Sequence, residues 1–388
     1  MITVSAIAFA VIVSVLLQSL NRGSYEMMID RMVSFNTGYL QIQDFRYDDE
    51  ASLDNAFFYD EELRERVLHA DDRIRKILPR LQTFMLAANG ASARGAMVFG
   101  IDPEKEDRFN DLKGYKTEGR FFELDEQAAV LSQGMADRLQ LTVGDTLVLL
   151  GQGRFGMSAS GLFKITGLMD HPIREMNNQA VYLPLNTAQE FLSAEDHLTA
   201  LMIAPERERQ TESVAAALRQ ALRHDDELVV FTWPELMPEL LDLMEFDLAG
   251  PRLMTVILYV VIGFGFFGTI LTMTMERIRE FGVLLSVGMR RVRLAAVVFL
   301  ETLFICLMGV ITGVILSLGL IALIDPIRLS GRAAQAVIDM GFEPVLPLSY
   351  APDQFYTQGI YVFLIAMLVF LFPLWKLFRL NIIEAARS

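Results

Sequence analysis

Residues Leu253–Met275 read LMTVILYVVIGFGFFGTILTMTM, and no charged residue interrupts them. A helix needs about 20 consecutive apolar residues to cross the hydrocarbon core of a bilayer. Three further stretches of this composition, each with at most one charged residue, cover residues 1–20, 294–324 and 359–377. The sequence therefore predicts a membrane protein with four transmembrane α-helices. The first is expected to remain as an anchor, because it lacks the basic start and the cleavage site of a signal peptide.

The part between the first two predicted spans has a different composition. Residues 21–252 contain 40 Asp and Glu against 24 Lys and Arg, which is a net charge of −16. About 230 residues are enough to enclose a separate hydrophobic core, so a large domain outside the membrane is predicted. Its acidity argues against a nucleic-acid partner, because phosphate binding requires lysine and arginine surfaces. The single cysteine, Cys306, excludes a disulfide within the chain.

The orientation follows from the basic residues beside the spans, which gather on the cytoplasmic side of a membrane. Residues 276–293 contain five arginines, and three basic residues lie at or after the end of the last span. Residues 325–358 contain only two. We therefore predict that segments 276–293 and 378–388 face the cytoplasm, and that the 21–252 domain and the 325–358 loop face outward.

Within the outer domain, helix-forming and strand-forming runs alternate, which predicts a mixed α/β domain in two lobes. Helices are predicted, wholly or largely, at Glu61–Leu78, Ala128–Leu139, Asn186–Leu192 and Glu212–Arg223. Strands are predicted at Leu147–Leu150, Gly161–Leu168, Ala180–Leu183 and Leu228–Thr232. Either Asn186 or Thr187 is expected to cap the third helix.

No combination of residues indicates a catalytic, metal or cofactor site in this chain. The four histidines lack the spacing of metal ligands, and Ser158 and Ser160 lack the G-x-S-x-G context of a nucleophile. Gly263–Gly268 matches G-x-G-x-x-G, but it lies inside a predicted span and not in a strand–turn–helix unit. The sequence contains no G-x-x-x-x-G-K-[ST], so ATP and magnesium are expected on a partner ATPase.

The segment ERIREFGVLLSVGMRRVR, residues 276–293, connects the second and third predicted spans. Its apolar residues recur with helical spacing, which predicts one amphipathic helix. The apolar face comprises Phe281, Leu284, Leu285, Gly288 and Val292. Such a helix either lies on the membrane surface or inserts into a groove of a soluble partner.

The third predicted span contains one ionisable residue, Glu301, and a G-x-x-x-G motif at Gly309 and Gly313. An unpaired charge inside a bilayer is costly, so Glu301 is expected to reach the cytoplasmic interface or to pair with an arginine such as Arg290 or Arg293. The two glycines indicate either close helix packing, within the chain or across a dimer, or ordinary glycine use in a membrane helix.

Residues 276–291 closely resemble the coupling helix of FtsX/MacB-type (type VII) ABC transporter permeases. The order of one span, a large outer domain and three further spans is also similar to this family. The ending Leu380–Arg387 resembles the family's L-x-P-x-E-A-L-R, with Ile382 and Ala386 in place of the proline and the second leucine.

Segments of the outer domain also resemble proteins of this family. Segments 118–124, 128–139 and 143–145 resemble the porter-like lobe of two-lobed periplasmic domains, whose second lobe is sabre-like. Segments 38–43, 163–169 and 180–189 are similar to the lipoprotein-releasing (LolC/LolE-like) permeases. Glu301, in contrast, is closer to the MacB-type pattern.

The resemblance implies an ABC permease without enzymatic activity of its own, in the bacterial inner membrane, with its large domain in the periplasm. The coupling helix would dock on a dimer of cytoplasmic ABC ATPases through Arg277, Arg279, Glu280, Phe281, Gly282, Leu284, Leu285, Gly288 and Met289. A second permease subunit, identical or paralogous, would complete the complex.

The expected function of the complex is the extraction of a lipoprotein or lipid from the outer leaflet. The alternatives are MacB-like mechanotransmission or efflux with a periplasmic adaptor, and FtsX-like regulation of a cell-wall hydrolase.

Overall fold

The computed structural model of this chain describes residues 2–90, 92–324, 331, 332, 334 and 347–378. These residues form two compact units, one of residues 28–241 and the other of the described residues up to 27 and from 242 onward. The C-terminal segment Leu380–Arg387, which resembles the family's L-x-P-x-E-A-L-R motif, lies outside the described residues, as does most of the predicted 325–358 loop.

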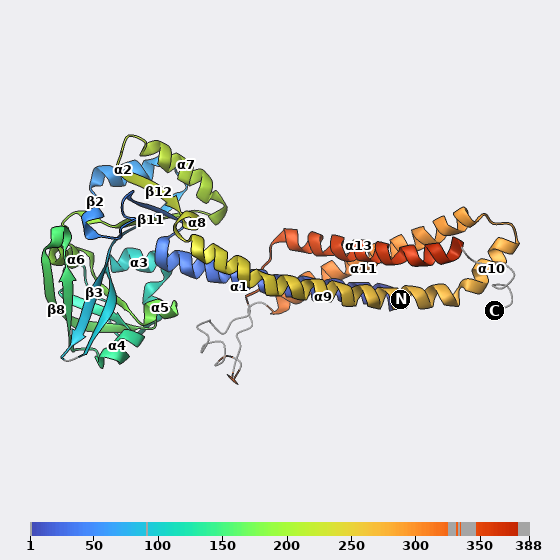
Figure 1. Cartoon of the computed structure of the whole chain (residues 1–388), viewed down its shortest axis with the longest axis horizontal. Helices are drawn as coiled ribbons and strands as arrows, with labels where there is room; N and C mark the ends of the chain where they lie inside the picture. The colour runs from blue at the N-terminus through green and yellow to red at the C-terminus, as the bar shows by residue number, and fades with distance from the viewer. Residues whose placement is uncertain (1, 91, 325–330, 333, 335–346, 379–388) are drawn as a thin grey trace. The chain divides into compact units, whose positions relative to one another are not determined.

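A mixed 10-stranded sheet forms the centre of the first unit (Figure 1), in the order β12-β1-β11-β3-β4-β9-β6-β8-β5, with β7 paired to β3 and β8. The strands are β1 Leu40–Asp44, β3 Ile74–Asn89, β4 Ser92–Ile101, β5 Lys116–Gly119, β6 Ala128–Ser132, β7 Thr146–Gln152, β8 Ser158–Met169, β9 Ala180–Pro184, β11 Ala200–Pro205 and β12 Leu228–Thr232. The β4–β9 and β6–β8 pairs are parallel, and the other pairs are antiparallel. A separate pair joins β2 Phe57–Phe58 to β10 His197–Leu198.

The helices of this unit surround the sheet, and α2 and α7 lie together beside β12 (Figure 1). They are α2 Glu61–Ala70, α3 Pro103–Asn110, α4 Gln133–Leu139, α5 Arg174–Asn177, α6 Leu185–Leu192, α7 Thr211–Ala221 and α8 Trp233–Leu236. A π-helical turn, η1 Val33–Thr37, precedes β1, and short 3-10 turns are η2 Leu53–Asn55, η3 Leu112–Tyr115, η4 Arg154–Gly156 and η5 Glu208–Gln210. The α/β class is confirmed, whereas the division into two lobes remains a prediction.

The strand β6 is buried on both faces of the sheet. Alternate residues of a strand point to opposite faces, so Ala129 and Leu131 join one hydrophobic core while Ala128 and Val130 join the other. Strand β9 divides its residues between the same two cores. The predicted helix over Ala128–Leu139 is therefore wrong in its first half. A short run that is apolar at every position does not reveal by its period whether it is a buried strand or a helix.

The prediction of one helix over Glu61–Leu78 is also wrong, because α2 ends at Ala70 and the chain then enters β3. The carboxylate of Asp71 accepts hydrogen bonds from the backbone N–H of Arg73 (2.9 Å) and from its guanidinium Nε (2.8 Å). Such side-chain bonds to nearby backbone compete with helical bonds. The same ion pair lowers the pKa of Asp71 to about 2.

The four predicted strands are confirmed as β7, β8, β9 and β12, and the predicted helix at Glu212–Arg223 as α7. The expected cap of α6 is wrong. Pro184 occupies the N-cap position, with no side-chain capping bond. The Asn186 amide instead donates to Asp125 Oδ1 (2.7 Å), and the Thr187 hydroxyl donates to the carbonyl of Glu126 (3.2 Å). Both side chains therefore bind the loop before β6.

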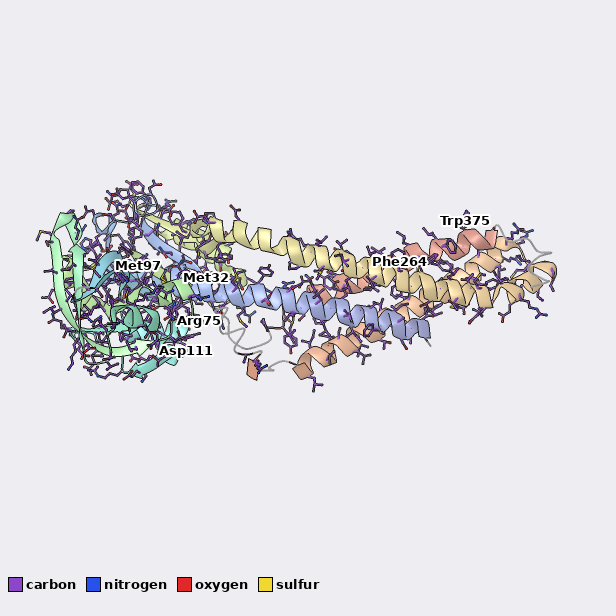
Figure 2. All side chains as sticks on the ribbon, turned by 60° about the horizontal axis from the view of Figure 1, so that its bottom comes forward. Met32, Arg75, Met97, Asp111, Phe264 and Trp375 are labelled. Atoms are coloured by element: carbon purple, nitrogen blue, oxygen red, sulfur yellow. The ribbon has the colours of Figure 1, made fainter. Side chains whose placement is uncertain are left out.

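The second unit is helical. Its long helices are the greater part of α1 Ile2–Met32, most of α9 Pro238–Glu276, α11 Arg291–Ile324 and α13 Pro352–Phe378. The short helix α10 Ile278–Ser286 lies between α9 and α11 in the sequence. Four of these, α1, α9, α11 and α13, are long and apolar enough to cross a membrane. Large apolar side chains are exposed along them, including Phe264 and Trp375, which are labelled in Figure 2. Such exposure is expected where lipid replaces water as the solvent.

Candidate functional site

The segment between the second and third spans forms a short helix between two turns. The prediction of one helix over residues 276–293 is wrong, because α9 ends at Glu276, α10 covers only Ile278–Ser286, and α11 begins at Arg291. The first turn is at Arg277, whose carbonyl accepts the N–H of Phe281 (3.0 Å).

The second turn depends on Gly288, which ends α10. The N–H of Gly288 donates to the carbonyl of Leu285 (3.2 Å), and the N–H of Met289 donates to that of Leu284 (3.1 Å). This pair of bonds is the Schellman arrangement, which places a left-handed residue just after the helix. The φ of Gly288 is +100°. Gly288 is therefore a helix terminator and not, as predicted, a member of the apolar face.

The predicted apolar face is divided between a buried and an exposed side. Phe281 and Leu285 pack with Leu294 and Ala295 at the start of α11, and Met289, Val298 and Leu374 pack against this cluster. Gly282 is buried as well. Leu284 is 39% exposed, and Val283, Val287 and Val292 are also exposed. We call Val283 and Leu284 of α10, together with Val287 just after its end, the exposed apolar strip of α10.

Charged residues surround this strip. Arg279, Glu280, Arg290, Arg291 and Arg293 are exposed. Arg277 instead turns toward α11, where its Nη1 lies 2.6 and 2.7 Å from the two carboxylate oxygens of Glu301. It also pairs with Glu280 (3.4 Å). The expected pairing of Glu301 with an arginine is thus confirmed, but the partner is Arg277 and neither of the named candidates, Arg290 and Arg293. No spacing in the sequence indicates the true partner, because Arg277 and Glu301 belong to different helices.

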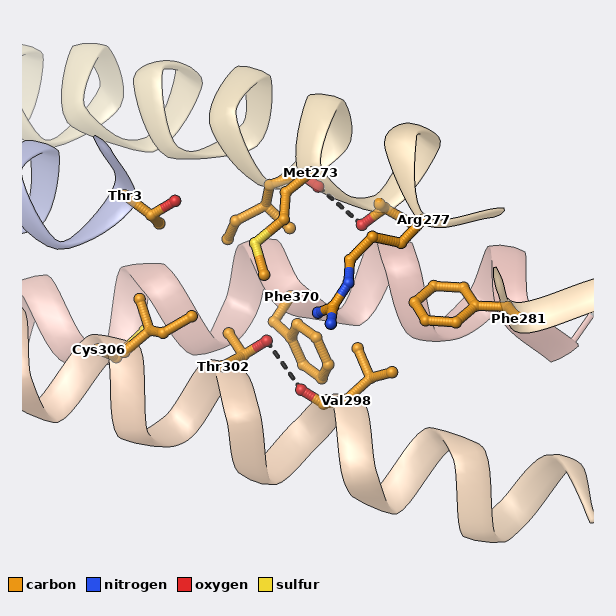
Figure 3. Close-up of a pocket in the computed structure, with 11 residues that line it drawn as sticks. Thr3, Met273, Arg277, Phe281, Val298, Thr302, Cys306 and Phe370 are labelled. Carbon is orange, nitrogen blue, oxygen red and sulfur yellow. Dashed lines mark hydrogen bonds between the residues drawn. The ribbon is translucent and has the colours of Figure 1, made fainter. Parts of the chain in front are cut away.

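A cavity of about 20 Å³ lies near this ion pair, between side chains of α9, α10, α11 and α13 (Figure 3). The Arg277 side chain extends between Thr302 and Phe281, with its guanidinium group drawn next to the Phe370 ring (Figure 3). This volume holds about one water molecule. The cavity is therefore too small for a substrate.

The two glycines of the third span lie against the first. A Cβ atom on Gly309 would lie 2.7 Å from two atoms of Ile7, and one on Gly313 would lie 2.7 Å from Val11 Cβ and 2.8 Å from the carbonyl oxygen of Ala8. Both distances are shorter than any side chain tolerates. The motif therefore marks a close contact of α11 with α1 within this chain.

Comparison with known proteins gives two family matches. The MacB-like periplasmic core domain family matches residues 1–221, and the FtsX-like permease C-terminal family matches residues 252–382. The crystal structure of the periplasmic region of MacB from Actinobacillus actinomycetemcomitans is 12% identical, with a TM-score of 0.37, over 53% of this chain and 94% of that one.

Two curated relatives illustrate the range of the family. The macrolide export ATP-binding/permease protein MacB of Rhodopseudomonas palustris is 24% identical over 70% of this chain and 43% of its own length. The lipoprotein-releasing system transmembrane protein LolE of Haemophilus influenzae is 23% identical over 68% of this chain and 65% of its own length. The chain thus spans less than half of the first relative and about two thirds of the second.

The two family matches together cover most of the chain and leave residues 222–251 unmatched between them. Four helices able to cross a membrane accompany an α/β domain of the extracellular kind. The chain therefore belongs to the FtsX/MacB-type family of ABC transporter permeases, with a MacB-like periplasmic core domain and an FtsX-like permease domain.

Proposed function

We propose that this chain is a permease subunit that couples ATP hydrolysis, by an ATPase outside these 388 residues, to work on the outer side of the bacterial inner membrane. The observation that carries the proposal is the exposed apolar strip of α10, which lies between two spans and beside three exposed arginines. A short helix with an apolar side and basic flanks fits the groove of a soluble protein. ATP and magnesium would bind that ATPase.

The packing of α10 supports a mechanical role. Phe281 and Leu285 are buried against the first turns of α11, and the Arg277–Glu301 pair joins the turn before α10 to the third turn of α11. A displacement of α10 by an ATPase would therefore move α11 with it, because well-packed elements shift as rigid bodies. The contact of Gly309 and Gly313 with α1 would pass the motion to the first span.

We propose lipoprotein or lipid extraction as the work performed, which the relationship to LolE supports. Each buried CH₂ group holds an acyl chain in the bilayer by about 0.8 kcal/mol, so extraction requires an energy source. The complex would contain two ATPases and a second permease subunit, either a copy or a paralogue of this chain. MacB-like mechanotransmission with a periplasmic adaptor is the second candidate, favoured by the MacB-like core domain.

Exchange of Leu284 for aspartate tests the docking. Leu284→Asp places a charge on the exposed strip without removing a buried contact, so the protein should fold and insert normally. We expect at least a tenfold lower recovery of an ABC ATPase with the detergent-solubilised full chain, since an unpaired charge buried in an interface costs several kcal/mol. Quantitative mass spectrometry of the purified complex measures this recovery.

Leu150→Asp is the matched control, because Leu150 has nearly the same exposure (40%, against 39% for Leu284) but lies in the outer domain. Equal ATPase recovery from the Leu284→Asp and Leu150→Asp proteins would refute the docking role. Gly288→Pro is unsuitable as a test. Proline cannot adopt the positive φ of Gly288, so the turn would fail whether or not an ATPase binds there.

The two candidate functions predict different proteins bound to the purified complex. Lipoprotein extraction predicts acylated proteins bound to the purified permease, whereas MacB-like mechanotransmission predicts a periplasmic adaptor. Mass spectrometry of the same preparation distinguishes them.

A further inference from the structure

The helical unit contains a second, much larger cavity, of about 570 Å³, between α1, α9 and α13. Its volume lies in the range of small-molecule sites. Its polar lining includes Arg22, Tyr25, Arg252, Tyr259, Gln358 and Tyr361. No aspartate or glutamate is among the described residues that line it.

The cavity lies at the outer end of the spans. Its α1 residues directly precede the extracellular domain in the sequence, and its α9 residues directly follow it. Tyr350, Tyr356 and Tyr361 are exposed near the start of α13. Tyrosine is enriched where a membrane protein meets the lipid headgroups, so the cavity is at headgroup depth.

The amide of the largely buried Gln358 lines this cavity. Gln358 is 4% exposed, and its Oε1 accepts hydrogen bonds from the hydroxyls of Ser14 (2.5 Å) and Tyr259. These two bonds fix the orientation of the amide group. Its Nε2 has no hydrogen-bond partner among the residues that the structure describes, although Gln358 lines the cavity. An amide N–H that lines a cavity can donate to a ligand oxygen there.

Two guanidinium groups add positive charge. Arg22 is held in place by Glu26 (2.9 Å) and Asp353 (2.5 Å), which neutralise it. Arg252 is exposed and forms no ion pair with any described residue, so its charge is available to a ligand. The wall therefore offers one cation without an ion pair among the described residues and several N–H donors, which suit an oxygen-rich anion.

We propose that this cavity binds the phosphodiester headgroup of a membrane lipid in the outer leaflet. Arg252 and the Gln358 amide would donate to the phosphate oxygens. The exposed Leu253, Val256 and Val260 of α9 adjoin the cavity and would contact the acyl chains. This site goes beyond the proposed function, because it requires no ATPase and its ligand carries a phosphate.

Native mass spectrometry of the detergent-solubilised full chain tests the proposal with three probes. These are phosphatidylglycerol, diacylglycerol with the same acyl chains, and inorganic phosphate. We expect phosphatidylglycerol to bind at least tenfold more tightly than diacylglycerol, and Arg252→Gln to weaken phosphatidylglycerol binding about tenfold, as loss of a charge-assisted hydrogen bond predicts. Arg252→Lys should restore part of the affinity.

Gln358→Leu should weaken phosphatidylglycerol binding while leaving diacylglycerol binding unchanged. Arg209→Gln, which removes an exposed charge from the outer domain, is the control and should change neither. Equal binding by Arg252→Gln and the unmodified chain, or equal affinity for the two lipids, would overturn the proposal. Displacement of the lipid by millimolar inorganic phosphate would assign the site to a free anion and would also overturn it. None of these lipid-binding measurements depends on ATPase docking.

Discussion

A buried ion pair in the outer domain ties the π-helical turn η1 to the sheet. The side chains of Arg80 and Glu106 are almost completely buried and pair directly. Arg80 Nη1 also donates to the carbonyl of Phe35 in η1 (2.7 Å), and the Asn110 amide donates to Glu106 (2.8 Å). Removing one member of such a pair leaves an uncompensated charge inside the protein. This ion pair therefore helps to anchor the segment that joins the first span to the domain.

We predict that Glu106→Gln lowers the free energy of unfolding of the outer domain by about 3–5 kcal/mol, because the Arg80 charge loses its counter-ion. Urea unfolding of the full chain in detergent, followed by the fluorescence of Trp233 in a Trp375→Phe background, measures the change. Glu104→Gln on the same helix removes an exposed carboxylate and should cost under about 1 kcal/mol. Similar losses in both variants would contradict the interpretation.

His171 should make the stability of this domain depend on pH. Burial lowers the pKa of His171 to about 4, and the nearby Arg80 charge adds to the effect. In the unfolded chain the pKa is about 6.5, so between pH 6.5 and 4 the unfolded state takes up a proton that the folded state does not. The folded state should lose roughly 3 kcal/mol as the pH falls through this range.

Unfolding of the His171→Asn variant at several pH values checks this prediction. Asparagine has an oxygen that can accept the N–H of Ile173, as Nδ1 of His171 does (3.0 Å), and it does not titrate. The slope of stability against pH should therefore flatten between pH 6.5 and 4. The same substitution at the exposed His69 should leave the slope unchanged. A steep slope that persists in His171→Asn would assign the effect to other groups.

Among the helices, the contact between α11 and α1 allows the sharpest test. Gly313→Val would place a branched side chain against the backbone carbonyl of Ala8, which cannot move aside without displacing α1. We expect a loss of about 1–3 kcal/mol from overpacking, seen as a lower Tm of the detergent-solubilised protein. Gly319→Val in the same helix is the control, since nothing lies within 4 Å of its Cβ position. Equal Tm values for the two variants would mean that α1 and α11 do not pack as described.

The secondary structure shows why some elements were predictable and others were not. β12 and α7 were predicted almost to the residue, because their patterns are local and their boundaries are clear. The sequence predicts β6 as helix, because both faces of this strand are buried in separate cores and its residues are apolar at nearly every position. The break of the 276–293 helix depends on the positive φ of Gly288, and a glycine at a helical position is no evidence by itself of a turn.

For the whole molecule, the proposed orientation places α10 and the outer domain on opposite sides of the membrane. Phe155 is 74% exposed in the outer domain, and Val287 is 82% exposed after α10. In a Cys306→Ser background, a membrane-impermeant maleimide should label Phe155→Cys in intact spheroplasts but should label Val287→Cys only after permeabilisation. Labelling of both from the same side would refute the orientation and, with it, docking to a cytoplasmic ATPase.

The amino-acid sequence by itself determined the four apolar helices, the acidic α/β domain between the first two, and the resemblance to FtsX/MacB-type permeases. The four helices can be predicted from the sequence because the transfer of an apolar segment into a bilayer depends on the composition of that segment alone. Only the tertiary structure decided that Glu301 pairs with Arg277, that Gly309 and Gly313 contact α1, and which side of α10 is exposed. Each of these depends on residues that are distant in the sequence and come together only when the helices pack, so no local pattern encodes them.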